Sequence, residues 1–362
     1  MPNLSTQIAN ELMDLVSQLP RVQASMTRDL KNAFAEYQRE MLAAVANADV
    51  MGVTARRYQE KRALKLVKSV KELTNITYRD IYKHTEAELI SVAATASDSM
   101  LNVVNGLAQG ELLTHTLTSP QPKYLVKHSV IDGATSAEWW GKQAANTTFK
   151  FKNVVQDAII KGEGTDTIVR SIRGTRANGY RDGFMNTAYN NARSLVHTSV
   201  QNVANESRLE MMKENDDVIE GVEWLSILDG HTSTICKVLD GKVWDLQYKP
   251  IGHKQEWPGS VAHWGERSTQ TMVLKGFGDL PKNKQALMKG QRTSMDGKVS
   301  GGVDYNDWLK AKDKSNPSFV SNTLGKEKYK IWKEKGLSMT DMVDQYNNPL
   351  TVEQLKVKFK VK

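Results

Sequence analysis

The sequence predicts a predominantly helical α+β protein, in which long N-terminal helices precede a small mixed α+β core and short C-terminal helices. Three observations support this fold class. The first 105 of the 362 residues contain a single glycine and no tryptophan, whereas six of the eight tryptophans follow Glu220. Stretches poor in glycine and proline favour uninterrupted helices, because glycine costs backbone entropy and proline removes a hydrogen-bond donor. Apolar residues recur every three or four positions in the N-terminal part, and strand and turn signals begin after Asp217.

Residues 1–107 are expected to form long antiparallel helices, each with one apolar stripe that packs on its neighbours or on a partner. Pro20 is expected to stop or kink the first helix, and the fourth is expected to end near Gly106. The four stripes are Leu4, Ile8, Leu12, Leu15 and Leu19; Val22, Met26, Leu30, Phe34, Tyr37, Met41 and Val45; Ala63, Leu66, Val67, Val70 and Leu73; and Tyr78, Ile81, Leu89, Val92, Ala96, Met100 and Val103.

Residues 108–217 begin as an irregular connector and continue as a helical region. Thr135 followed by Glu138 has the spacing of a capping box, which predicts a helix that carries Trp139 and Trp140. Further helices are expected at Thr165–Ile172 and from about Arg181 to Lys213.

Residues 218–276 have the texture of a small α+β core. The segment Gly221–Leu228 alternates like a strand, and Asp229-Gly230 and Asp240-Gly241 are turn signals. Further strands are expected at Lys242–Trp244 and Gln270–Leu274. A unit of this size needs support from its neighbours to be stable.

Turn chemistry within this core singles out several polar residues. Asp229 is placed to cap a turn, and either Thr232 or Ser233 to start a short helix that carries Cys236. His263 and Arg267 share a helical face if their segment is a helix. If the segment is a loop, their side chains can converge on the Cys236 turn instead.

Residues 277–362 are expected to form a basic tail of short helices. One helix holds Trp308, one spans Tyr329 to Trp332, and one starts at a capping box formed by Thr351 and Gln354. The last residues alternate lysine with apolar side chains, and we expect them to fray, with strand addition to a partner as the alternative. The four lysines of this end are Lys356, Lys358, Lys360 and Lys362.

Composition limits the class of protein. No apolar run approaches the length needed to span a membrane, and Glu11 and Asp14 interrupt the N-terminal leucines, so neither a membrane protein nor a signal peptide is expected. The single cysteine, Cys236, excludes an intrachain disulfide and a four-cysteine zinc site. A soluble chain made in a reducing cytoplasm is therefore expected.

A net charge of +8 favours nucleic acid or another acidic surface as a partner. Arg57, Lys61, Lys65 and Lys68 recur at helical spacing and form one positive face. Such a face can contact double-stranded DNA without sequence specificity. The alternatives are a solvated face and a face that meets an acidic protein.

The α+β core carries the most informative pattern: a tryptophan-bearing strand, D-x-x-T-S-x-x-C, L-D-G-K, and then H-x-x-x-R-S. The residues of this pattern are Trp224, Asp229, Thr232, Ser233, Cys236, Leu239, Asp240, Gly241, Lys242, His263, Arg267 and Ser268. The pattern resembles the phage Mu F-like head-morphogenesis family, the minor capsid proteins encoded beside the portal in many tailed phages. The resemblance covers about residues 163–357, and its one departure is Glu266, where the family usually has a second cysteine.

The resemblance implies a minor head protein that binds the phage portal protein during procapsid assembly in the host cytoplasm. It would remain in the virion interior near the portal vertex, with ejection alongside the DNA as an extension of that role. The major capsid or scaffold protein is a further candidate partner, and the N-terminal helices would supply the docking surface. A second hypothesis is a sequence-independent DNA-binding protein that acts in packaging or ejection. A third is a cysteine- or metal-dependent enzyme.

The chemical motifs leave catalytic, cofactor-binding and metal sites unassigned. The side chains that zinc requires are those of Cys236, His263, His231 and His253, and the carboxylate of Glu266 could serve as a fourth ligand. Without a C-x-x-C pair, the sequence favours a structural role for them, and no metal or cofactor is predicted. Cys236 and His263 could also form a thiolate–imidazole pair, but no third group or oxyanion hole is evident.

We therefore expect no enzymatic activity. The sequence contains no G-x-S-x-G, H-E-x-x-H or G-x-x-x-x-G-K-[ST] motif. The missing P-loop excludes the ATP-driven packaging motor.

Overall fold

The computed structural model describes residues 8, 11, 15, 18–53, 55–276, 291–300, 302–344 and 346–361. The described chain has the predicted predominantly helical α+β fold. It divides into two compact units. Residues 20–92 and 122–203 form one, called the helical unit below, and residues 1–19, 93–121 and 204–362 form the other, called the α+β unit. Among the described residues, no helix combines the length and the apolar character that crossing a membrane requires.

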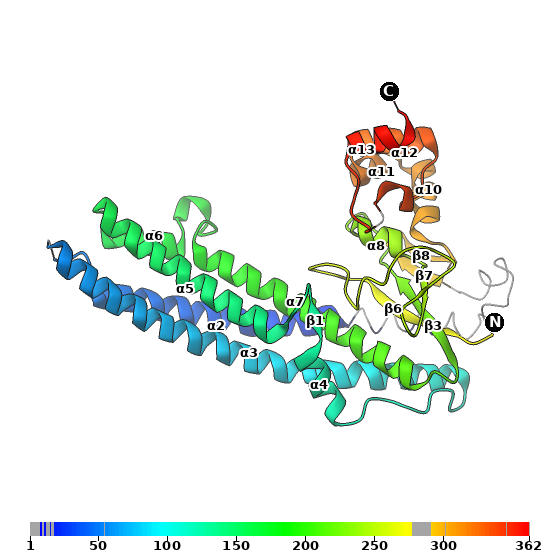
Figure 1. The fold of residues 1–362 in the computed structure, drawn as a ribbon, viewed down its shortest axis with the longest axis horizontal. Coiled ribbons are helices and arrows are strands. Elements are labelled where there is room, and N and C mark those ends of the chain that lie inside the picture. The colour runs from blue at the N-terminus through cyan, green and yellow to red at the C-terminus, as the bar shows by residue number, and fades with distance from the viewer. Residues whose placement is uncertain are drawn as a thin grey trace. The chain divides into compact units, whose positions relative to one another are not determined.

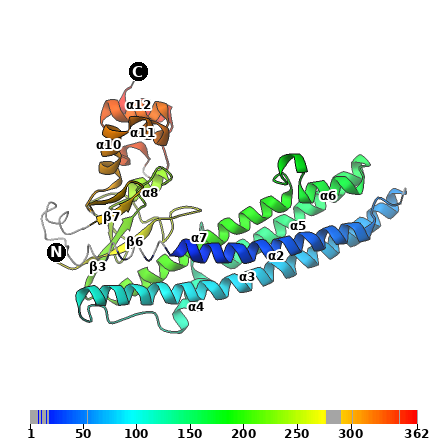
Figure 2. The ribbon, with the colours of Figure 1, turned by 180° about the vertical axis from the view of Figure 1, so that it is seen from behind.

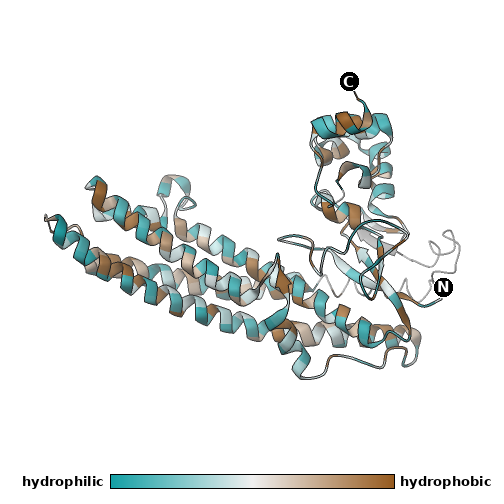
Figure 3. Cartoon of the chain, viewed as in Figure 1, coloured by the Kyte–Doolittle hydropathy of each residue, from teal (hydrophilic) through white to brown (hydrophobic). Residues whose placement is uncertain are grey.

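Four long helices dominate the first part of the fold, and they run side by side in Figures 1 and 2. They are α2 (Leu19–Ala48), α3 (Arg56–Ala108), α5 (Ser136–Lys161) and α7 (Phe184–Glu214). The shorter elements between them are α4 (Pro120–His128), β1 (Val130–Ile131), β2 (Ala134–Thr135), α6 (Thr165–Arg173) and η1 (Arg176–Asn178). Hydrophilic and hydrophobic residues alternate along α2 and α3 (Figure 3), as their apolar stripes predict.

The helix boundaries correct one expectation and agree with another. The third and fourth predicted helices are one continuous helix, α3, since no glycine or proline interrupts it before Gly106. Thr74, near the expected break, stays in the helix, where its hydroxyl donates to the Val70 carbonyl at 2.7 Å. Ile8, Glu11 and Leu15 are helical and Gln18 forms a turn, so the helical path is interrupted next to Pro20 as expected. Pro20 itself lies in the first turn of α2, a position where its missing N–H costs nothing. Most of the helix predicted before Pro20 lies outside the described residues.

An aromatic cluster joins the four long helices within the helical unit. Phe34 and Tyr37 of α2 make edge-to-face contacts with Tyr78 of α3, at centroid distances of 5.7 and 6.2 Å. Tyr78 also contacts Trp140 of α5, and Phe34 contacts Tyr189 of α7. Edge-to-face geometry is the favourable arrangement for aromatic rings, so the cluster fixes how these helices pack.

The α+β unit contains a four-stranded antiparallel sheet with strand order β5-β4-β3-β6. The strands are β3 (Ile219–Leu225), β4 (Val243–Asp245), β5 (Pro250–Ile251) and β6 (Thr269–Leu274). The predicted strand at 221–228 therefore begins two residues earlier and ends three residues sooner. Val222 on the central strand pairs with Trp244 on one side and Met272 on the other. All three are buried in one apolar cluster together with Trp224.

A second apolar cluster lies under the C-terminal helices and includes Tyr305, Trp308 and Leu355. The elements of this part of the chain are the hairpin β7 (Gln291–Ser294) and β8 (Gly297–Ser300), and the helices α10 (Tyr305–Ser315), α11 (Pro317–Leu324), α12 (Lys326–Lys335), η2 (Thr340–Met342) and α13 (Val352–Phe359).

The C-terminal end corrects another expectation, because it is neither frayed nor extended. Thr351 and Gln354 form the predicted capping box, and Leu355 is buried, so residues 352–359 form the helix α13. Lys358 donates from Nζ to the Asp341 carbonyl at 2.9 Å. The alternation of lysine with apolar residues is therefore a helical pattern, not a strand; Lys360 caps the helix, and Lys362 lies outside the described residues.

Candidate functional site

The turn after β3 is built around the Asp229 carboxylate. Its Oδ1 accepts the main-chain N–H groups of His231 at 2.9 Å and Thr232 at 2.8 Å, and the Thr232 hydroxyl donates to the Ile227 carbonyl. Aspartate stabilises turns in this way because its short side chain reaches amides two and three residues ahead. The predicted role of Asp229 as a turn cap is confirmed.

Arg267 joins this turn from 38 residues further along the chain. Its guanidinium donates to both oxygens of Asp229, with N···O distances of 2.9 and 3.0 Å. Burial alone would raise the pKa of Asp229, but the hydrogen bonds from Arg267 and Thr232 outweigh burial and hold that pKa below its ordinary value. Residues 261–268 are not helical, so the loop alternative holds and Arg267 converges on the turn.

The next element, α8 (Thr234–Leu239), positions the cysteine. Ser233 is its N-cap, since its Oγ accepts the N–H of Cys236 at 3.2 Å. Of the two predicted helix starters, Ser233 therefore caps the helix, while Thr232 closes the preceding turn. The cap sets Cys236 in the first turn of α8, where the residue is buried.

Asp240 and Gly241 end α8 and return the chain to the sheet. The Asp240 carboxylate accepts the N–H of Ser226 at 2.7 Å on Oδ1 and that of Tyr305 at 2.9 Å on Oδ2. It thereby connects the end of β3 to the start of α10. Gly241 has a φ of +72°, in the left-handed region that glycine adopts without steric cost, and its N–H donates to the Trp224 carbonyl.

Three side chains meet at the buried end of this network. Cys236 Sγ lies 3.2 Å from His263 Nε2 and 3.1 Å from Glu266 Oε2, and the His263 and Glu266 atoms are 3.5 Å apart. In the part of the chain that the structure describes, this is the group of His, Cys and carboxylate ligands close enough together to hold a metal ion. His231 and His253, considered with them from the sequence, are not members of the group; His253 instead lies 2.7 Å from the Val243 carbonyl.

The surroundings of the three side chains determine their chemistry. Glu266 is buried, and its Oε1 accepts the N–H groups of Ser268 at 2.7 Å and Arg267 at 2.9 Å. Burial, reinforced by the negative charge of Glu266, raises the pKa of the Cys236 thiol well above its ordinary value. A nucleophilic cysteine requires the opposite shift, because the thiolate is the reactive species.

The predicted DNA-contact residues lie on α3. Arg57, Lys61, Lys65 and Lys68 are all exposed, and no ion pair is recorded for any of them among the described residues. Other cations of the same segment are neutralised: Arg56 pairs with Glu60, and Arg62 with Asp49. The four residues therefore form a free positive face on the helical unit.

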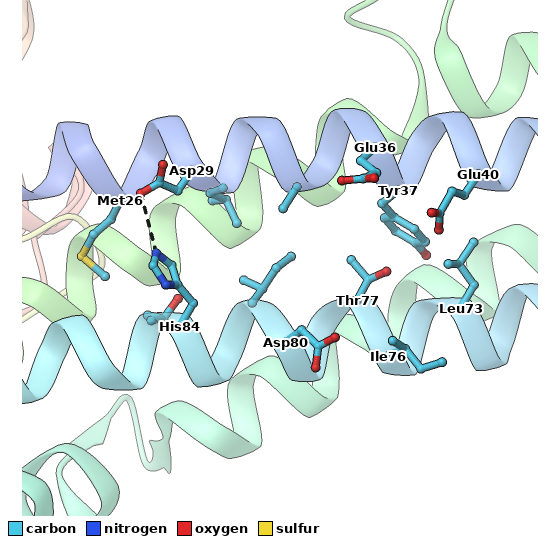
Figure 4. Close-up of a pocket in the computed structure, with 14 residues that line it drawn as sticks. Met26, Asp29, Glu36, Tyr37, Glu40, Leu73, Ile76, Thr77, Asp80 and His84 are labelled. Atoms are coloured by element: carbon cyan, nitrogen blue, oxygen red, sulfur yellow. Dashed lines mark ion pairs between the residues drawn. The ribbon is translucent and has the colours of Figure 1, made fainter.

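An acidic groove between α2 and α3 was not predicted from the sequence. Figure 4 shows the groove, which has a volume of about 390 Å³. Its rim carries Asp29, Glu36, Glu40 and Asp80, with Asp29 lying 3.6 Å from His84. Its apolar lining includes Met26, Leu30, Leu73 and Ile81. The spacing of 29, 36 and 40 on one helical face was a signal that could have indicated it.

Comparisons with known proteins add no relative to these observations. Neither a scan against protein-family models nor searches of curated proteins and of solved structures found a match to this chain.

Proposed function

We propose that this protein is a minor head protein of a tailed phage that binds the portal protein during procapsid assembly and is retained inside the virion. The proposal comes from the resemblance of residues 163–357 to the Mu F-like head-morphogenesis family. Its role would be structural, without catalysis.

One observation carries the proposal: the residues of the family-like pattern form a single connected network. Asp229 joins Arg267 across 38 residues, and Cys236 lies against His263 across 27 residues. Asp240 continues the network to Tyr305, 65 residues away. A chance agreement of scattered letters has no reason to bring those letters into contact, so the convergence supports a shared structural motif.

The acidic groove between α2 and α3 is the docking surface that we propose on the helical unit. Its apolar floor suits the apolar face of a helix, and its carboxylates suit flanking lysines or arginines. We therefore propose that a basic amphipathic helix of the portal protein occupies it.

Co-expression with the portal protein encoded beside this chain tests the proposal. Size-exclusion chromatography and native mass spectrometry should show a complex of defined stoichiometry. Glu36→Lys with Glu40→Lys, both exposed in the groove, should weaken the complex at least tenfold, as expected for losing two charge pairs of about 1 kcal/mol each. Glu72→Lys with Glu88→Lys makes the same charge change at exposed positions outside the groove and should leave binding unchanged.

Two outcomes would contradict this reading. Separation of the two proteins at low and moderate salt, together with absence of this protein from procapsids and virions, would remove the assembly role. If the groove variant and its control bind the portal protein equally well, the portal-binding proposal stands, but the groove is not the binding site.

The free positive face on α3 favours DNA binding as a second function. If its four cations each neutralise one phosphate, log K should fall against log salt with a slope of about −3.6. Arg57→Glu with Lys61→Glu should make that slope shallower by about 2. The same variant should bind a random duplex more weakly in fluorescence anisotropy. Lys31→Glu with Arg39→Glu, exposed on α2, is the matched control, and an equal effect of both pairs would rule out a dedicated face.

A further inference from the structure

The ligand atoms of Cys236, His263 and Glu266 already have the spacing of a metal site. Their three separations are 3.2, 3.1 and 3.5 Å. In tetrahedral zinc sites the metal–ligand distances are about 2.0–2.3 Å, which places neighbouring ligand atoms about 3.3–3.6 Å apart. The three atoms therefore outline one face of a tetrahedron, and shifts of a few tenths of an ångström would admit a metal ion.

The tautomer of His263 directs a lone pair into this face. Its Nδ1 lies 2.8 Å from the Trp264 carbonyl oxygen, which can only accept a hydrogen bond. In the neutral form of the ring, Nδ1 therefore carries the proton, and Nε2 presents its lone pair to Cys236 and Glu266. A histidine ligand is oriented in the same way by a carbonyl partner on its other nitrogen.

The cluster holds more acceptors than protons. Glu266 Oε1 accepts two main-chain N–H groups and Oε2 a longer one, from Ala262 at 3.4 Å, while Oε2 also faces His263 Nε2 and Cys236 Sγ. The thiol has a single proton to share between the imidazole nitrogen and the carboxylate. A dication at the centre would satisfy all three atoms at once.

We propose that Cys236 Sγ, His263 Nε2 and Glu266 Oε2 bind one zinc ion, with water as the fourth ligand. A thiolate and an imidazole select zinc over magnesium or calcium, which prefer oxygen ligands. The His263 side chain is 31% exposed while that of Glu266 is 1% exposed, so the fourth position is open to solvent on the histidine side.

Charge balance also favours the ion. On binding, the Cys236 thiol loses its proton to solvent and the S–Zn bond forms, without any change of oxidation state. The thiolate and carboxylate together carry a charge of −2, which the dication neutralises inside a buried site. The metal would join α8 to the loop 261–268, and this inference is independent of the proposed phage role.

Metal titration of the full-length protein tests the site. After removal of metal with a chelator, the protein should bind one zinc ion per chain in competition with a chromophoric chelator. It should release a proton and gain thermal stability on binding. The cobalt(II) form should be four-coordinate and show a thiolate-to-cobalt charge-transfer band, which only Cys236 can supply because the chain has no other cysteine.

Substitutions separate this site from binding elsewhere. Glu266→Gln and His263→Ala should each weaken zinc binding at least tenfold, whereas His231→Gln and His253→Gln should bind as the wild type does. Cys236→Ser should abolish the charge-transfer band. If that variant does not fold, the test is the presence of the band in the wild type and its loss in His263→Ala. Absence of zinc binding by the folded wild type, or a cobalt complex without thiolate charge transfer, would overturn the proposal.

Discussion

The helical unit and the α+β unit bury their polar side chains in different ways. In the helical unit, neutral hydroxyls pair between neighbouring helices, as Tyr37 does with Thr74 at 2.6 Å and Tyr78 with Thr147 at 2.9 Å. In the α+β unit, carboxylates accept main-chain amides from distant segments, as Asp240 does from Ser226 and Tyr305.

The difference predicts how each unit tolerates substitution. Removing a hydroxyl from a pair leaves one neutral partner, which often retains a second hydrogen bond. Removing a carboxylate oxygen leaves a buried N–H unpaired, at a cost of about 1–3 kcal/mol for each group. The stability of the α+β unit should therefore depend on a few polar residues in addition to its apolar core, whereas that of the helical unit is spread along its apolar stripes.

The largest effect is expected from Trp224→Ala, which removes a fully buried ring from the centre of the α+β unit. Its cost should be about 3–5 kcal/mol of unfolding free energy. Denaturant unfolding followed by tryptophan fluorescence should shift strongly, because six of the eight tryptophans lie in this unit.

Phe151→Ala is the matched large-to-small change in the helical unit, where Phe151 of α5 is fully buried. It should move the transition seen by far-ultraviolet circular dichroism more than the one seen by fluorescence. Coincident shifts of both probes in both variants would show that the two units unfold as one, which would break the comparison.

Asp240→Asn tests the dependence on a carboxylate directly. The amide has one oxygen where the carboxylate has two, so either the Ser226 or the Tyr305 N–H loses its acceptor. We expect a loss of about 2–3 kcal/mol, measured by urea denaturation. Asp307→Asn, on the exposed side of α10, makes the same chemical change and should cost less than about 0.5 kcal/mol. Equal effects of the two substitutions would contradict the role assigned to Asp240.

The two units also differ in how far the sequence predicts them. The helices that start at Thr135 and Thr351 were correctly predicted, because a capping box and an apolar stripe are local signals. The boundary between the third and fourth expected helices was wrong, since a weak stretch of sequence does not break a helix whose neighbours support it. Local patterns thus predict the existence of helices better than their ends.

Non-local contacts explain what the sequence left open in the α+β unit. The turn roles of Asp229 and Ser233 follow from residues within four positions; that of Asp229 was predicted, and Ser233 was one of the two predicted helix starters. Whether His263 and Arg267 would lie on a helix or converge on the Cys236 turn depended on contacts across 27 and 38 residues, so both alternatives stood. The partners of Asp240 had no local signal at all.

A smaller effect, of opposite sign, is expected at Lys237 in the α+β unit. Lys237 is 4% exposed, and its Nζ lies 5.1 Å from the centroid of the Tyr305 ring. Burial lowers its pKa to about 8, although Asp229 and Cys236 act in the opposite direction. At pH 7 the native state therefore holds a buried charge that destabilises it. Lys237→Met removes this charge and also the cation–π contact, and the net effect should be a rise of about 1–2 kcal/mol in the unfolding free energy.

The pH dependence of the unfolding free energy independently checks the sign of this effect. Between the native pKa of about 8 and the ordinary value of 10.5, the unfolded chain binds more protons at this position than the native one. The wild type should therefore gain stability relative to Lys237→Met as pH rises through this window. Lys310→Met, at an exposed position of α10, should show no such trend, and a constant gap for Lys237→Met from pH 7 to 10 would refute the cause proposed.

The smallest effect is expected from Tyr37→Phe in the helical unit. The Thr74 hydroxyl donates to the Val70 carbonyl, so in the 2.6 Å pair it is Tyr37 that donates, and the substitution removes one hydrogen bond without leaving a buried N–H or O–H unpaired. Burial raises the pKa of Tyr37, which keeps its hydroxyl protonated as this arrangement requires. We expect a loss of about 0.5–1.5 kcal/mol, measured by circular dichroism, against no change for the exposed Tyr58→Phe. A loss as large as that of Asp240→Asn would mean that hydroxyl pairs and carboxylate–amide contacts are equally important, and that the two units do not differ in the way their buried polar groups stabilise them.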